Sequence, residues 1–389
     1  MTAYLAQLGV VCALGRGEAE LRAQLFGAHP RGLSATSPFP ERPPMVVGAV
    51  DGPLPRLEHD APAYRSRNDA LVFAALEQLE GLDGVIARYG PERVGVVIGT
   101  STSGIGESER AYQWLQTRGE LPTWWHFGQQ ELGTPARFVA SRLGLRGPCA
   151  VVSTACTSSA KALVAGARWL RAGLVDAVIA GGADSLCEFT VAGFQALNSV
   201  SPERCNPMSR NRRGINVGEA AALFLMTGAE GPVRLAGWGE TSDAFHVSAP
   251  EPTGRQAIAA MTSALTRAGC DAGDVEYVNL HGTATEQNDA MESTATAAVV
   301  GPKVPVSSTK PLTGHTLGAA GALEAAVCWL TLTGDGGLPP HLWDGEADPR
   351  LSPLQLVAPG ERARAVPRVA MSNSFAFGGN NVSLLFVRE

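Results

Sequence analysis

Four residues of this chain have side chains that could carry out acyl chemistry: Cys156, His281, Lys310 and His315. Cys156 follows the apolar run 149–152 and opens a stretch of small residues that is typical of the start of a buried helix. Unpaired N–H groups and the helix dipole at such a position favour the thiolate, which is the form that attacks carbonyl groups. The alternative is an inert buried cysteine, which is common for a free thiol.

The two histidines and the lysine lie in the second half of the chain, each after a predicted strand. His281 follows the apolar run 275–280, and Lys310 and His315 lie in the loop STKPLTGH, before a helix of small and apolar residues. Lysine occurs only at positions 161, 303 and 310, so a lysine in this loop suggests a need for a compact ammonium group. A cation and hydrogen-bond donors near a thiol would support nucleophilic acyl transfer.

Two other kinds of site use cysteine and histidine. A Cys-His-His metal site is disfavoured by the scattered, unpaired spacing of the ligands. A cysteine protease needs one histidine that is oriented by Asn or Asp, so the second histidine and the lysine would have no role. Neither alternative accounts for the whole set.

The elements that must position these residues repeat along the chain. VVSTACTSSAKALVAGARWL resembles VSSTKPLTGHTLGAAGALEAAVCWL in its order of strand, loop and small-residue helix, and NVGEAAALFLM resembles NNVSLLFV. This duplication predicts two α/β lobes with mostly parallel sheets, whose Ser-Thr loops meet at one central face. We predict strands at 4–11, 93–98, 149–152, 176–180, 220–226, 233–238, 275–280, 304–307, 368–371 and 381–387, helices at 68–79, 254–268 and 317–332, and an irregular cap at 28–64.

Composition limits the class of protein. The 389 residues, 45% hydrophobic and 17% charged, indicate a compact globular chain with large cores. The net charge of −6 argues against general nucleic-acid binding. Seven cysteines without close-spaced pairs favour a reducing cytoplasm over a disulfide framework or zinc site, and no apolar run reaches the length of a membrane span.

The motifs around the four residues resemble those of the elongating, Cys-His-His type of β-ketoacyl-acyl-carrier-protein synthase, in the thiolase-like superfamily. STACTSS surrounds Cys156, YVNLHGTAT surrounds His281, VSSTKPLTGHTLGAAGALE contains Lys310 and His315, and NSFAFGGNN contains Phe377; SDAFHVSAP and GINVGEAAALF also match. The resemblance covers nearly the whole chain. It implies an α/β, thiolase-like fold of two duplicated lobes, with mixed, mostly parallel sheets in a layered α-β-α-β-α arrangement. We place the lobes at residues 1–231 and 232–389.

The resemblance implies a role for each matched residue in a decarboxylative Claisen condensation. Cys156 corresponds to the nucleophile that accepts the acyl chain from acyl carrier protein. His281 and His315 correspond to the pair that binds the malonyl thioester carbonyl and assists decarboxylation. Lys310 corresponds to a supporting residue, with Glu324 as its acidic partner, and the backbone N–H groups of Cys156 and Phe377 correspond to the oxyanion hole. Thr283 and Thr285 correspond to contacts of the phosphopantetheine arm. Ile105 and Phe377 correspond to gates beside the acyl pocket.

Three related activities are distinguished by residues of this chain. A priming synthase would carry Asn in place of His315, a degradative thiolase would carry a second cysteine in the region NSFAFGG, and a chain-length-factor subunit would lack the nucleophile. The chain departs from the family pattern at Asn380, 207–209, 212–215 and Ala220. Several of these positions lie where the family shapes its acyl pocket or carrier contacts. The expected substrates are acyl chains of fatty-acid, polyketide or aryl-polyene type, and the aromatic stretch 124–127 points weakly to a flat or unsaturated chain.

Acyl carrier protein is the expected partner, and its 4′-phosphopantetheine carries the substrates, so no other cofactor and no metal are expected. Carrier docking is expected at a basic surface formed by Arg65, Arg67, Arg210, Arg212 and Arg213. The aromatic-rich stretch 112–130 predicts a pocket wall or a subunit interface, with ordinary packing as the alternative. A homodimer is expected; the alternative is a partner subunit of a heterodimeric synthase with little activity alone.

Overall fold

Most of the described strands join into one wide, mixed sheet, and two short strands pair in a separate one. In the computed structural model, which describes residues 2–27, 29–40, 42–229 and 231–389, the strand order is β12-β11-β10-β13-β14-β9-β1-β8-β7-β5-β6. The first half contains β1 (Tyr4–Cys12), β5 (Val94–Gly99), β6 (Cys149–Val152), β7 (Ala177–Asp184) and β8 (Ala220–Thr227). The second half contains β9 (Val233–Ser242), β10 (Tyr277–Asn279), β11 (Pro305–Ser307), β12 (Gln355–Leu356), β13 (Val369–Ala376) and β14 (Asn380–Arg388).

The two halves of the sheet repeat one topology. β6, β5 and β7 run parallel, and β8 and then β1 continue antiparallel. In the same order, β11, β10 and β13 run parallel, and β14 and then β9 continue antiparallel. The duplication predicted from the sequence is confirmed, and it makes the loop after β6, with Cys156, equivalent to the loop after β11, with Lys310 and His315.

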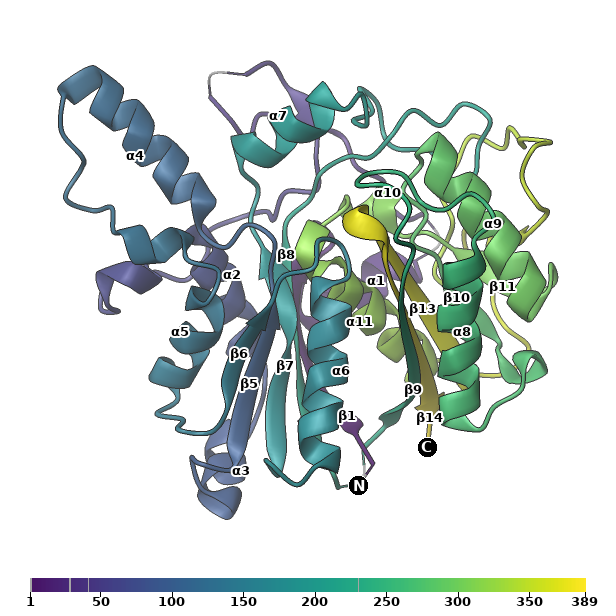
Figure 1. The fold of residues 1–389 in the computed structure, drawn as a ribbon, viewed down its shortest axis with the longest axis horizontal. Coiled ribbons are helices and arrows are strands. Elements are labelled where there is room, and N and C mark those ends of the chain that lie inside the picture. The colour runs from purple at the N-terminus through teal and green to yellow at the C-terminus, as the bar shows by residue number, and fades with distance from the viewer. Residues whose placement is uncertain (1, 28, 41, 230) are drawn as a thin grey trace.

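Helices cover the half-sheets and fill the space between them (Figure 1). α6 (Ser158–Arg171) and α11 (Ala320–Leu332) form the middle layer and pack on each other and on strands of both halves. α2 (Arg67–Leu76) and α5 (Thr134–Arg142) cover the outer face of the first half, and α8 (Arg255–Ala268), with α9 (Glu286–Val300) beside it, covers that of the second. The layers confirm the expected fold class.

Shorter elements surround these layers. Before α2, the chain forms β2 (Gly15–Arg16), α1 (Gly17–Leu25), β3 (Ala35–Thr36), β4 (Met45–Val46) and η1 (Pro62–Tyr64), so the expected cap is largely irregular. α4 (Ile105–Arg118) projects from the body as an arm, and α3 (Leu82–Tyr89) lies at the opposite end of the strands from α7 (Glu188–Ala196) (Figure 1). None of the helices in the described ranges has the length and apolar character needed to span a membrane.

The middle layer depends on small residues where α6 and α11 meet. Every residue of α11 is buried, which is possible because its sequence, AGALEAAVCWLTL, is small or apolar on nearly all sides. A Cβ atom at Gly321 would lie 2.7 Å from both the Cβ and the backbone N of Ala160 on α6. Gly321 therefore allows the two helix backbones to approach, and this approach brings together the loops that carry Cys156 and His315.

We expect Gly321→Ala to lower the free energy of unfolding by about 1–3 kcal/mol, because the added methyl group overpacks a contact with backbone. Gly84→Ala is the matched control, since a Cβ atom at this position in α3 would meet no atom within 4 Å. The control should stabilise the chain by about 0.5–1 kcal/mol, the usual gain for alanine over glycine inside a helix. Urea denaturation measures both changes, and equal shifts would contradict the packing argument.

Candidate active site

Cys156 lies just after a strained turn between β6 and α6. Ala155 has a φ of 53°, a left-handed conformation that non-glycine residues rarely adopt. Ser158 holds the turn, because its Oγ donates to the carbonyl of Ala155 (2.5 Å) and accepts from the N–H of Thr154 (2.8 Å). The turn leaves Cys156 only 7% exposed, between the two halves of the molecule.

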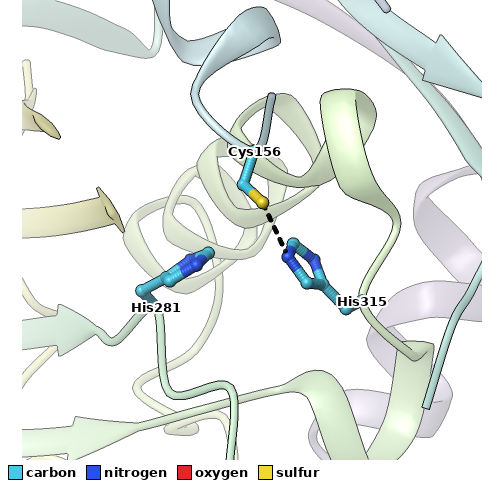
Figure 2. Close-up of side chains that lie close together, drawn as sticks. All are labelled: Cys156, His281 and His315. Atoms are coloured by element: carbon cyan, nitrogen blue, oxygen red, sulfur yellow. Dashed lines mark hydrogen bonds between the residues drawn. The ribbon is translucent and has the colours of Figure 1, made fainter. Parts of the chain in front are cut away.

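Cys156 and His315 are in direct contact across the two halves. The Nε2 atom of His315 lies 3.0 Å from the Sγ atom of Cys156, and the rings of His281 and His315 lie side by side with centroids 5.2 Å apart (Figure 2). The backbone fixes His315, whose N–H donates to the carbonyl of Asn216 (2.7 Å) and whose carbonyl accepts from the N–H of Gly218 (2.9 Å). The predicted convergence of the two loops at one face is what the structure shows.

The ammonium group of Lys310 lies beside His281. It donates to the carboxylate of Glu324 and to the carbonyl of His281, and it lies 3.5 Å from the Nδ1 atom of His281. Lys310 and Glu324 are both buried, so each charge depends on the other for compensation. Because an ammonium group can only donate, Nδ1 of His281 acts as an acceptor and the proton of the neutral ring lies on Nε2.

Burial keeps the thiol and both imidazoles neutral. It raises the pKa of Cys156 to about 12, although the Lys310 charge and the backbone N–H groups of Phe377 and Cys156 act in the opposite direction. Burial and the Lys310 charge lower the pKa of His281 and of His315 well below the ordinary value. The predicted thiolate is therefore wrong for the resting site: α6 begins only at Ser158, and desolvation outweighs any effect of the helix dipole.

A cavity of about 170 Å³ opens onto these groups. Its lining includes Cys156, His281, His315, Thr283, Thr285 and Phe377. The hydroxyl groups of Thr283 and Thr285 lie 2.9 Å apart, and the Phe377 ring packs against Phe194 with centroids 5.6 Å apart. Ile105, the first residue of α4, is not among the described residues that line this cavity. Of the two expected gates, the structure therefore places Phe377 at the cavity with Cys156, but not Ile105.

Two acidic residues that the sequence analysis missed hold the loop HGTAT. Glu292 accepts from the N–H groups of His281 and Gly282, at 2.7 Å each, and Asp289 accepts from that of Ala284 at 3.2 Å. Both carboxylates are fully buried on α9, and burial raises the pKa of Glu292 to about 8. The sequence offers one signal for their role, which is that both acids lie within the first two turns of the helix that follows HGTAT.

The thiol and the two imidazoles also form a compact set of ligand atoms, all within 4.8 Å of one another. A metal ion there would lie close to the Lys310 ammonium group, and like charges at such a distance repel strongly in a buried site. The arrangement is better suited to nucleophilic attack and hydrogen bonding to a substrate carbonyl.

The arginines expected to dock a carrier differ in availability. Arg65, Arg210 and Arg213 are exposed. Arg67 is also exposed, but its guanidinium binds the buried carboxylate of Glu219 through two nitrogen atoms. Arg212 has a side chain that is only 2% exposed and pairs with Asp348 at 2.6 Å. The prediction that Arg212 docks a carrier is therefore wrong, because its charge is compensated inside the protein.

The aromatic stretch lies on the arm formed by α4 and on the segment after it. Trp114 and Trp124 are each 41% exposed and Phe127 is 59% exposed, and none of the three lines the cavity at Cys156. These three aromatic residues are therefore not a wall of this cavity, and the expectation of a flat acyl chain stays a prediction. An exposed aromatic surface agrees with the other interpretation, a subunit interface.

Comparison with known proteins defines the class of protein. Residues 70–230 match the N-terminal domain of beta-ketoacyl synthases, and residues 233–342 match their C-terminal domain. The chain therefore belongs to the β-ketoacyl synthase family, which consists of condensing enzymes that form carbon–carbon bonds.

Similar proteins come from several bacteria. The chain is 34% identical over 357 residues to nodulation protein E of Rhizobium meliloti (strain 1021), with 88% of each covered. It is 34% identical over 379 residues to the tetracenomycin polyketide synthase ketoacyl synthase alpha subunit of Streptomyces glaucescens, covering 88% of this chain and 86% of that one. The chain also matches one chain in the structure of a ketosynthase with its chain length factor from Xenorhabdus doucetiae. The two are 42% identical with a TM-score of 0.90, and the match covers 100% of this chain and 98% of that one. A beta-ketoacyl synthase from Burkholderia phymatum STM815 has 29% identity, a TM-score of 0.88 and coverage of 100% and 99%.

The neutral thiol predicts the pH dependence of Cys156 alkylation by iodoacetamide. Because the pKa of Cys156 is raised to about 12, the reactive thiolate fraction should grow about tenfold per pH unit between about pH 7 and pH 9. Intact-mass kinetics measure the rate in a Cys149→Ser background, since Cys149 is exposed, and Cys156→Ala gives the baseline. A rate that is already maximal near neutral pH would indicate a thiolate–imidazolium pair and contradict this prediction.

Proposed function

We propose that the chain is a 3-oxoacyl-[acyl-carrier-protein] synthase, which condenses a malonyl-carrier thioester with an acyl group held on Cys156. The observation that carries this proposal is the 3.0 Å contact between the Cys156 sulfur and the His315 Nε2 atom, beside His281 and at the edge of a cavity. The contact pairs a nucleophile with a group that can take its proton, and it leaves the second imidazole available to a substrate.

In the first half-reaction, the Cys156 thiol attacks the thioester carbonyl of the acyl-carrier substrate. The thiol proton passes through Nε2 of His315 to the departing carrier sulfur, so no net proton is released. The backbone N–H groups of Cys156 and Phe377, which also act on the sulfur, supply the donors for the oxyanion of the tetrahedral intermediate.

In the second half-reaction, the malonyl thioester lies next to the histidines. The Nε2–H group of His281 donates to its carbonyl oxygen, and His315 adds a second donor in its Nε2–H tautomer, so the enolate is stabilised as carbon dioxide leaves. The enolate carbon attacks the Cys156 thioester, and the tetrahedral intermediate expels the Cys156 thiolate. A solvent proton then restores the thiol. Burial and the charge of Lys310, which is paired with Glu324, keep His281 neutral and return His315 to its neutral form once the thiol proton has passed on.

The proposed substrates are carried on the 4′-phosphopantetheine of acyl carrier protein. Thr283 and Thr285 present hydroxyl groups to the cavity for contacts with this arm, and Phe377 is the proposed gate. Similarity to a subunit of a polyketide synthase supports acyl chains of polyketide, fatty-acid or aryl-polyene type. A thiol nucleophile needs reducing surroundings, which supports action in the cytoplasm.

Mixing the chain with a range of acyl-carrier thioesters should add one acyl group to Cys156, which intact mass spectrometry detects. Cys156→Ala should show no adduct and lose condensation by about 1,000-fold or more, because the nucleophile is gone. His281→Ala should still be acylated but should decarboxylate malonyl-carrier thioester poorly, since His281 is placed to bind the malonyl carbonyl rather than to activate the sulfur. An acyl adduct on Cys156→Ala would contradict the assigned nucleophile.

We further propose that the acidic carrier docks at Arg65, with Arg67 beside it and with Arg210 and Arg213 as a second basic cluster. The exposed guanidinium groups support this proposal, because they can reach an acidic partner on a chain with a net charge of −6. Arg210 also pairs with Glu346 at 3.2 Å, so its charge is partly compensated. Arg67 should contribute less than Arg65, since its charge is compensated by Glu219.

Arg65→Glu and Arg213→Glu should each raise the KM for acyl-carrier substrate by about three- to tenfold with kcat unchanged, because charges at the rim of an interface act mainly on encounter. Arg88→Glu is the matched control, since Arg88 is exposed on α3, at the opposite end of the strands from α7 (Figure 1). Steady-state kinetics with one carrier measure all three variants. An unchanged KM in both test variants would exclude this docking surface.

The second candidate function is the catalytic subunit of a pair that is active only when assembled. Identity of 42% to a chain from a complex of a ketosynthase with its chain length factor favours this candidate. The exposed aromatic residues of the α4 arm offer a surface for such a partner. Acylation of Cys156 only after co-expression with a related synthase subunit would establish this dependence, whereas acylation of the isolated chain would exclude it.

A further inference from the structure

Asp184 is a buried carboxylate that the proposed reaction does not use. It is the last residue of β7 and is fully buried. Its partners are hydroxyl and backbone N–H groups, which come from two loops that lie far apart in the sequence. A buried carboxylate without a cation is stable only when such donors surround it.

Most of these donors lie in the loop after β5. Oδ1 of Asp184 accepts from the hydroxyl groups of Thr100 (2.5 Å) and Thr102 (2.9 Å) and from the N–H groups of Ser101 (2.8 Å) and Thr102 (2.9 Å). The other oxygen, Oδ2, accepts from the N–H group of Gly318 at 2.6 Å, in the turn that follows His315. The carboxylate therefore joins a loop of the first half to the catalytic loop of the second.

The turn after His315 is shaped to reach this carboxylate. A Cβ atom at Gly318 would lie 2.6 Å from the backbone N of Ser101 and 2.7 Å from Oδ2 of Asp184, so only glycine allows the approach. Leu317 has a φ of 49°, a conformation that is costly for a side chain of its size. The contacts of Asp184 help to hold the backbone next to His315 in this strained form.

The loop after β5 also reaches the nucleophile turn and the start of the arm. The Oγ atom of Ser101 donates to the carbonyl of Ala155 (3.4 Å), the residue before Cys156. The N–H group of Ile105 donates to the carbonyl of Thr102 (3.2 Å). One carboxylate thus ties together the segments that carry Cys156, His315 and Ile105.

We propose that Asp184 is a positioning residue that sets the approach of His315 to Cys156, and that it controls acylation of Cys156 rather than substrate binding. This inference rests on the proposed function. Asp184 acts on the position of the loops and not on the charge at the sulfur. The charged groups that shift the pKa of Cys156 are Lys310 and Glu324. Removing its hydrogen bonds should therefore move the two catalytic loops without a direct change in the charge that acts on the sulfur.

Asp184→Asn tests the proposal, because the amide keeps the shape of the side chain but turns an NH₂ group toward N–H or O–H donors. We expect the rate of Cys156 acylation to fall by about 10- to 100-fold, the range that small misplacements of reacting groups produce, with the KM for acyl-carrier substrate within about twofold. Alkylation of Cys156 by iodoacetamide at fixed pH should instead rise by more than about twofold, because a thiol that loses Nε2 of His315 as its hydrogen-bond acceptor ionises more readily. Since alkylation needs no carrier, it tests the position of His315 even if no carrier substrate acylates the wild-type chain.

Asp348→Asn is the matched control, since Asp348 is also a buried carboxylate but binds Arg212 and Arg350, outside these loops. It should lower Tm and leave acylation and alkylation unchanged.

Ser101→Ala removes only the hydroxyl that touches the nucleophile turn, so it keeps the test valid if Asp184→Asn does not fold. We expect acylation slowed by about three- to tenfold, with KM again unchanged. A folded Asp184→Asn variant with acylation and alkylation within about twofold of wild type, or a Ser101→Ala variant with both unchanged, would overturn the proposal.

Discussion

The ammonium group of Lys310 is the interaction on which the site depends. A buried cation is costly, and it is tolerated here because Glu324 and the His281 carbonyl accept from it. Burial keeps both imidazoles neutral, and the Lys310 charge adds to this effect. The ammonium group also sets the tautomer of His281, so that an N–H donor remains for a substrate. The same charge acts against the desolvation of the Cys156 thiol without overcoming it. One cation thus acts, alongside burial, on the protonation of a thiol and two imidazoles that come from both halves of the molecule.

Backbone strain accompanies this arrangement in each catalytic loop. Ala155, Ala284 and Leu317 all have positive φ, and they lie next to Cys156, in the loop HGTAT and after His315. Each of these loops is tied down by buried polar side chains: Ser158 holds the first, Asp289 and Glu292 the second, and Asp184 the third. Strained turns persist only where the surroundings determine them, and here the surroundings are two rigid half-sheets and the helices between them.

Local patterns in the sequence predicted much of this structure. The repeated order of strand, Ser-Thr loop and small-residue helix was enough to predict two similar lobes and the meeting of Cys156 with the loop of Lys310 and His315. Properties that depend on burial were not predictable in this way. The thiol is protonated because it is desolvated, Arg212 is unavailable because Asp348 compensates it inside the fold, and the aromatic residues of the arm are exposed because α4 leaves the body. Asp184 escaped notice because nothing close to it in sequence indicates that it accepts from the N–H group of Gly318, 134 residues away. Glu292 lies only 11 residues after His281, in the helix that follows HGTAT, so its position was a usable signal.

The direct contact between Cys156 and His315 joins residues 159 positions apart, and this separation has a consequence for synthesis of the protein. The strands of the first half of the sheet are complete by Thr227, but α6 cannot be enclosed until α11 is made, and Phe377, the proposed oxyanion donor, follows later still. Contacts of such long range form slowly. A nascent chain that ends before Lys310 therefore carries its cysteine without the His315 imidazole, the ammonium group and the Phe377 N–H on which the proposed acylation depends. The duplicated architecture delays the chemistry until folding is complete.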